Sequence, residues 1–127
     1  MAAIELTKEN FESTITNNDI VLVDFWAEWC GPCRGFAPVY EKVSADHPHI
    51  VFGKVDTEAQ PELSAAFEIM SIPMLMIFRD NILLYAQPGS IPESALVDLV
   101  NQVEALDMDA VRAELEEQTA NAGSQSN

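Results

Sequence analysis

The feature that most constrains the fold of this chain is a short apolar segment followed closely by a helical pattern. Residues 20–25, Ile-Val-Leu-Val-Asp-Phe, are rich in β-branched and aromatic side chains, which is typical of a buried strand. Apolar side chains then recur at steps of three and four, as on one face of an amphipathic helix, at Phe36, Val39, Tyr40 and Val43. The two cysteines of the chain, Cys30 and Cys33, lie between these patterns. The sequence therefore places both sulfurs at a junction between a strand and a helix.

The rest of the chain repeats this alternation. Strand patterns are expected at residues 3–6, 50–56, 74–78 and 82–85, and helical patterns after Thr7, from about Pro32 to Asp46, after Pro61 and from Pro92 to Leu106. Asp80 and Asn81 are expected to form a hairpin turn, because both residue types tolerate positive φ. Alternating strands and helices favour a parallel sheet, and the final hairpin adds antiparallel strands. We therefore predict an α/β domain of order β-α-β-α-β-α-β-β-α.

Length and composition predict one folded domain with an extension. A chain of 127 residues with 48% apolar residues is long enough to bury a core. After Leu106 the composition becomes acidic, and from Thr119 onward it consists mainly of small and polar residues. We predict a domain over residues 1–106 and an acidic C-terminal extension over residues 107–127, partly helical and then disordered.

The charge balance argues against several classes of partner. Six basic and 21 acidic residues give a net charge of −15, which repels phosphate backbones and excludes nucleic acid as a partner. Solubility explains this acidity more simply than attraction to a basic partner does. No run approaches the roughly 20 apolar residues of a membrane helix, so no membrane association is expected. The N-terminal residues lack the pattern of a signal peptide, which predicts a cytoplasmic protein, although a mature secreted form would look the same.

The spacing of Cys30 and Cys33 leaves three interpretations: a redox couple, half of a metal site, or a structural bridge. The βαβ pattern around the pair favours the redox couple. A zinc site would need two further ligands, but His47 and His49 are closer in sequence than zinc-binding histidines usually are, so no metal is expected. At a helix start, backbone N–H groups stabilise a Cys30 thiolate. Asp24 lies within an apolar strand, where burial raises the pKa of a carboxyl.

Residues 21–33, Val-Leu-Val-Asp-Phe-Trp-Ala-Glu-Trp-Cys-Gly-Pro-Cys, closely resemble the active-site signature of the thioredoxin family. Further residues match in order and spacing over about residues 3–106: Pro38, Lys54, Ser71-Ile72-Pro73 and Gly89. The resemblance implies a thioredoxin fold. Its central mixed five-stranded sheet would have its first three strands parallel, a closing antiparallel hairpin, and helices on its flanks.

The resemblance also implies the activity of a protein-disulfide reductase. Cys30 would be the nucleophile that forms a mixed disulfide with the target, and Cys33 the resolving cysteine that releases it. Asp24 would accept the proton of Cys33, and Lys54 would tune Asp24. Gly31 and Pro32 would tune the redox potential, since proline at this position is typical of the reducing members, whereas histidine marks oxidants and isomerases.

The same resemblance implies a substrate-binding edge. It consists of Trp29, Ile72, Pro73, Met74 and Gly89, with Pro73 expected in the cis form so that the Ile72 backbone can pair with an extended substrate. The chain departs from the family at Met74, where threonine is usual. It also carries Glu68 at a position where the family usually has glycine.

Family resemblance further implies the partners. No cofactor is expected to bind, and electrons would come from a thioredoxin reductase, commonly an NADPH-dependent flavoprotein. The other partners would be disulfide-containing target proteins, and the chain would be a monomer. Two alternatives remain: a thioredoxin-like binding module or holdase with secondary redox activity, and an oxidant or isomerase.

Overall fold

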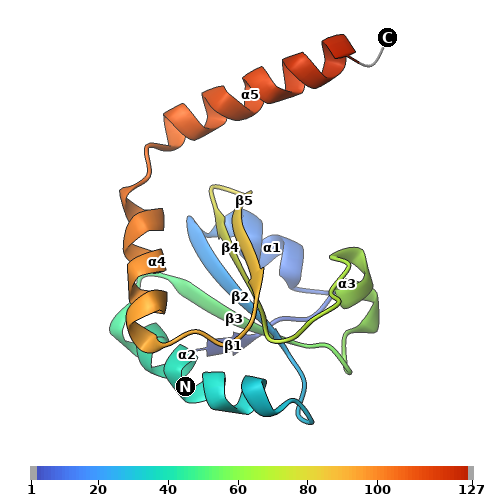
Figure 1. The fold of residues 1–127 in the computed structure, drawn as a ribbon, viewed down its shortest axis with the longest axis vertical. Coiled ribbons are helices and arrows are strands. Elements are labelled where there is room, and N and C mark those ends of the chain that lie inside the picture. Colours follow the sequence, from blue (N-terminus) through green and yellow to red (C-terminus); the bar gives the residue numbers. More distant parts are fainter. Residues whose placement is uncertain (1–2, 126–127) are drawn as a thin grey trace.

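The computed structural model describes residues 3–125, with side chains described up to residue 120. One five-stranded sheet has the order β1-β3-β2-β4-β5. Its strands are β1 (Ala3–Glu5), β2 (Ile20–Trp26), β3 (Val51–Asp56), β4 (Met74–Arg79) and β5 (Ile82–Pro88) (Figure 1). The first three strands are parallel to one another, whereas β4 is antiparallel to both β2 and β5. The predicted mixed sheet with a closing hairpin is therefore confirmed.

Helices cover both faces of the sheet. One face packs against α2 (Gly31–Asp46) and α4 (Glu93–Ala105), and the other packs against α1 (Phe11–Asn17) and α3 (Pro61–Ala66). Strand β2 lies at the centre of the sheet and is buried on both faces, which explains its nearly continuous apolar sequence. Because successive side chains of a strand alternate, Leu22 belongs to the α2–α4 core, and Val23 and Phe25 belong to the other. Asp24 therefore points toward α2.

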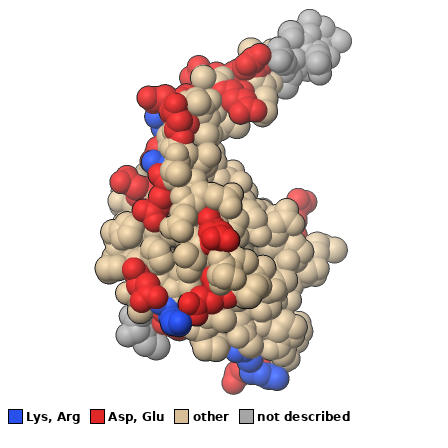
Figure 2. Space-filling model, turned by 60° about the vertical axis from the view of Figure 1, so that its left-hand side comes forward, with Lys and Arg blue, Asp and Glu red and all other residues tan. Residues whose placement is uncertain are grey.

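The extension is a single helix, α5 (Met108–Gln125), which runs away from the sheet (Figure 1). Oδ1 of Asp107 accepts the backbone N–H groups of Asp109 and Ala110, so the helix starts with a side-chain cap. We predicted disorder from Thr119 onward, but the helix continues to Gln125; positions 126–127 lie outside the described residues. Helical hydrogen bonds are local, so they can form without the burial that the composition cannot provide. Figure 2 shows acidic side chains along this helix.

The junction before α5 is held by Arg79. Its Nη1 donates to the carbonyl oxygens of Val103 at 2.6 Å and Leu106 at 3.0 Å, at the C-terminal end of α4. Met108 is buried, so α5 starts against the domain. None of the helices within the described residues is long and apolar enough to cross a membrane.

Candidate active site

The two cysteines lie at the start of α2, as the sequence predicted. They form a disulfide with their Cα atoms 5.2 Å apart. Cys30 is the N-cap residue, and its Sγ accepts the backbone N–H of Cys33 at 3.2 Å. Pro32 occupies the first helical turn, where its missing N–H removes no helical hydrogen bond. The helix therefore directs an N–H donor at the sulfur of Cys30.

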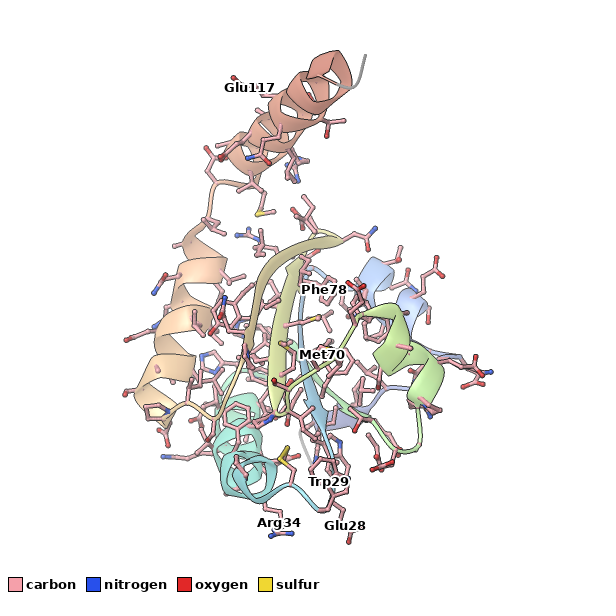
Figure 3. All side chains as sticks on the ribbon, turned by 45° about the vertical axis from the view of Figure 1, so that its right-hand side comes forward. Glu28, Trp29, Arg34, Met70, Phe78 and Glu117 are labelled. Atoms are coloured by element: carbon pink, nitrogen blue, oxygen red, sulfur yellow. A yellow bond between two sulfur atoms is a disulfide. The ribbon has the colours of Figure 1, made fainter. Side chains whose placement is uncertain are left out.

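The two sulfurs have different surroundings. Both cysteines are buried, but Sγ of Cys30 lies 3.8 Å from the carbonyl oxygen of the half-buried Ile72. The neighbouring Trp29 is 66% exposed and lies at the same end of the molecule as the disulfide (Figure 3). Cys33 instead lines an inner cavity of about 80 Å³ together with Asp24, Trp26 and Lys54. Cys30 thus lies beside Ile72, and Cys33 lies beside the cavity that contains Asp24.

Asp24 is the acidic group of this cavity. It is 1% exposed, and its Oδ1 has no hydrogen-bond partner among the described residues. Burial raises the pKa of the carboxyl from 3.8 to about 7, against the opposing effect of the positive charge on Lys54. The rise that the apolar strand predicted is therefore present, and its main cause is desolvation.

Lys54 lies directly opposite Asp24 in the parallel pairing of β2 and β3. Its ammonium group, however, lies over the indole of Trp26, with Nζ 4.8 Å from the ring centroid. The sequence patterns did not predict this contact between Trp26 and Lys54. The alternation of side chains along a strand could have indicated this neighbourhood. Residues two apart on a strand share a face, so Trp26 lies on the same face as Asp24.

The predicted substrate edge lies where β4 begins. The Ile72–Pro73 peptide bond is cis, as expected. The N–H of Gly89 donates to the carbonyl oxygen of Pro73 at 2.8 Å, which places these two positions side by side. Met74 is half-buried and packs with the core on the α1–α3 side, so only part of its side chain is available at this edge.

Two further residues near this edge were not singled out from the sequence. Met70 is 91% exposed on the segment that leads to Ile72 (Figure 3). Glu58 accepts the indole N–H of Trp29 at 2.6 Å, a contact between residues far apart in sequence. Both features depend on the tertiary structure, and no local sequence pattern predicts them.

The histidines do not join the cysteines. His47 follows the C-terminal end of α2, opposite the end at which Cys30 and Cys33 lie, and its Nδ1 lies 2.8 Å from the carbonyl oxygen of Val43. His49 contacts Glu104. Among the residues that the structure describes, no group of three or more histidine, cysteine or acidic side chains is placed to hold a metal ion.

Comparison with known proteins identifies the family. The sequence model named thioredoxin matches residues 2–102, which is most of the chain. The chain belongs to the thioredoxin family. This membership confirms the resemblance carried by residues 21–33, and it makes the protein a thiol–disulfide oxidoreductase that reduces protein disulfides.

Individual relatives agree with this membership. A protein of Streptomyces coelicolor named "Putative thioredoxin 2" is 60% identical over 122 residues, which cover 96% of this chain and 91% of the relative. The thioredoxin of Chlamydia pneumoniae is 37% identical over 97 residues, covering 76% of this chain and 94% of the relative.

Solved structures give the same fold. A thioredoxin from Plasmodium falciparum superposes with a TM-score of 0.72 at 35% identity, covering 79% of this chain and 97% of that chain. A mutant thioredoxin from Halobacterium salinarum gives a TM-score of 0.76 at 28% identity, covering 83% and 93%. The fold of this chain is the thioredoxin fold. Members of this family bind no cofactor of their own; they act on disulfide targets and are reduced by thioredoxin reductase.

Proposed function

We propose that this thioredoxin reduces its targets with Cys30 as the nucleophile and Cys33 as the resolving cysteine. The observation that carries this assignment is the asymmetry of the pair. Cys30 lies beside the carbonyl of Ile72, where the substrate edge is proposed, whereas Cys33 lines the cavity that contains Asp24. A target disulfide can approach Cys30 along that edge, and Cys33 is placed to deliver its proton to Asp24.

In the first step, the Cys30 thiolate attacks one sulfur of the target disulfide. A bond forms between Cys30 and that sulfur, and the other target sulfur leaves as a thiolate. The N–H of Cys33, 3.2 Å from Sγ of Cys30, and the start of α2 favour negative charge on the attacking sulfur. The start of α2 therefore stabilises the thiolate form of Cys30 that attacks the target.

In the second step, Cys33 loses its proton to Asp24 and attacks Cys30. The Cys30–Cys33 disulfide forms, the mixed disulfide breaks, and the second target sulfur leaves with the electron pair. A carboxylate whose conjugate acid has a pKa of about 7 is a stronger base than an ordinary aspartate. At neutral pH a large fraction of it is still deprotonated and able to accept a proton. Lys54 tunes this carboxyl through its positive charge.

The target segment is proposed to lie along the edge formed by Trp29, Ile72, Pro73, Met74 and Gly89. Ile72 can pair with an extended target backbone, as in strand addition, and the exposed face of Trp29 offers apolar contact. Gly31 and Pro32 set the geometry of the short segment between the sulfurs. With proline there, we expect a reducing potential of about −270 mV, as is typical of thioredoxin.

The cellular setting follows the family. We propose a cytoplasmic monomer that receives electrons from an NADPH-dependent flavoprotein thioredoxin reductase. The catalytic domain would comprise residues 1–106, and residues 107–127 would be an extension outside the redox cycle.

Trapping of mixed disulfides tests the assignment of the two cysteines. Cys33→Ser should accumulate a disulfide between Cys30 and a target, identified by mass spectrometry of the linked peptides. Cys30→Ser should neither trap targets nor reduce insulin. Full insulin reduction by Cys30→Ser would contradict the assignment. Retention of the biological role without disulfide turnover in the unmodified protein would favour the binding module.

A further inference from the structure

Lys54 has two competing neighbours on the face of the sheet that α2 covers. In the pairing of β2 with β3, Asp24 lies opposite Lys54, and Trp26 lies opposite Asp56. Residues paired in this way share a face, so Lys54 can reach either the carboxyl directly across from it or the indole on the diagonal. The ammonium lies over the indole, 4.8 Å from the ring centroid and within the range of cation–π attraction.

The carboxyl of Asp24 consequently lacks the ion pair that its strand position would allow. Both residues are described, and no nitrogen–oxygen distance between them is within the 4.0 Å of an ion pair. Oδ1 of Asp24 also has no hydrogen-bond partner among the described residues. Coulomb attraction draws an ammonium toward a buried carboxylate, and the indole of Trp26 offers this ammonium a competing site.

We propose that Trp26 is a positioning residue. Its indole ring holds the Lys54 ammonium away from Asp24, which leaves the carboxyl without an ion-pair partner and able to accept the proton of Cys33. This inference rests on the proton-acceptor role of Asp24 proposed above. Trp26 also packs against the cluster of Ala27, Cys30 and Cys33, but the role inferred here runs through Lys54.

The arrangement of cavities supports the inference. Trp26 and Lys54 line the inner cavity with Asp24 and Cys33, and they also line an outer recess of about 310 Å³. The acidic groups of that recess are contributed by β1, α2 and β3: Glu5, Glu41 and Asp56. These carboxylates attract the ammonium toward the recess that the indole also lines. The other charged group at the inner cavity is Arg34 of α2, and the buried hydroxyl of Tyr40 is the remaining titratable group near Asp24.

The chemical consequence concerns the strength of the base. An ammonium in contact with Asp24 would stabilise the carboxylate and weaken it as a proton acceptor for a thiol. Held over Trp26, the same charge acts on Asp24 from a greater distance. With its ammonium over the indole, Lys54 lowers the pKa of Asp24 to some extent without forming an ion pair with the carboxylate.

The test is an NMR titration of the Asp24 carboxyl carbon in the disulfide form. Trp26→Leu removes the π face, so Lys54 should swing to Asp24 and the pKa of Asp24 should fall by about one unit or more. Trp26→Phe retains a π face and should keep most of the original pKa. An unchanged pKa in Trp26→Leu would overturn the inference.

A Lys54→Met background shows whether Trp26 acts on Asp24 through the lysine or by excluding water from the carboxyl. If Trp26 acts through Lys54, then Trp26→Leu should not lower the pKa of Asp24 once Lys54→Met is present. An equal fall in that background would overturn the inference, because the ring would then act by excluding water. The single Lys54→Met variant should raise the pKa of Asp24.

Fluorination provides a test that preserves the shape of the side chain, for use if Trp26→Leu does not fold. In a Trp29→Phe variant, fluorotryptophan is incorporated at Trp26 alone, and increasing fluorination weakens the negative face of the ring. The pKa of Asp24 should fall progressively with the number of fluorine atoms. A pKa that does not respond would overturn the inference.

The failure of this inference can be told apart from that of the proposed function. If Asp24→Asn does not slow release of the mixed disulfide by Cys33, the proton-acceptor role of Asp24 is wrong. If Asp24→Asn slows release but Trp26→Leu leaves the pKa of Asp24 unchanged, only the role of Trp26 is wrong.

Discussion

Replacing Asp24 by asparagine should stabilise the protein in a way that depends on pH. The pKa of the carboxyl is raised from 3.8 to about 7, chiefly by desolvation. Between these values the native state binds a proton that the unfolded state does not, so the free energy of unfolding falls as the pH rises. Below the lower value both states are protonated and the effect vanishes; above the higher value the loss is complete.

The magnitude follows from the size of the shift. Each pKa unit corresponds to about 1.4 kcal/mol, so the rise from 3.8 to about 7 represents about 4 kcal/mol of stability lost above neutral pH. Asparagine carries no charge at any pH, so its own packing penalty is constant. The difference in unfolding free energy between Asp24→Asn and the unmodified protein should therefore grow by about 4 kcal/mol between roughly pH 4 and pH 8.

Urea denaturation of the disulfide form at a series of pH values measures this difference. The exposed aspartate of α4 provides the matched control, since Asp98→Asn makes the same chemical change at the surface and should alter stability only slightly. A difference for Asp24→Asn that stays flat between pH 4 and pH 8 would refute the reasoning. It would mean that the carboxyl is solvated or paired, and the cavity would then hold no unusual base.

Three further changes test other parts of the structure. Removal of residues 107–127 should leave insulin reduction within about twofold. It should lower stability by about 1–2 kcal/mol, because the buried Met108 side chain is lost. A large loss of activity would contradict the assignment of catalysis to residues 1–106. Tyr40→Phe removes a 2.8 Å hydrogen bond to the buried Gly53 carbonyl, and in urea should cost about 1–3 kcal/mol; no change would show that this carbonyl finds another donor. Glu68→Gly relieves a φ of 52° and should raise stability by about 1 kcal/mol in calorimetry, whereas a lower melting temperature would mean that the glutamate side chain outweighs its backbone strain.

Local sequence signals predicted most of the fold because the relevant physics is local. The apolar run at residues 20–25 and the stripe that follows it gave β2 and α2 nearly to the residue. The left-handed backbone of Asp80 and Asn81, with φ of 52° and 66°, follows from a two-residue hairpin turn. The raised pKa of Asp24 follows from one acidic residue within a strand buried on both faces.

Contacts between segments far apart in the sequence were harder to predict from local patterns. The placement of Lys54 over Trp26 requires the register of β2 with β3, which strand patterns alone do not specify. The same holds for the hydrogen bond between Trp29 and Glu58. The length of α5 was underestimated because composition reports the ability to bury surface, and a helix that protrudes depends on its own hydrogen bonds and its cap.

The position of α5 bears on how the redox site can work. Figure 3 places Trp29 near the disulfide at one end of the molecule and Glu117 of α5 at the other. Arg79 and the buried Met108 fix the start of α5 at the end of the domain remote from Cys30. A helix anchored there does not cover the Ile72 edge, so a target can dock at the cysteines while α5 stays in place. The catalytic asymmetry therefore resides within the domain, in the contrast between Cys30 beside Ile72 and Cys33 beside the unpaired carboxyl of Asp24.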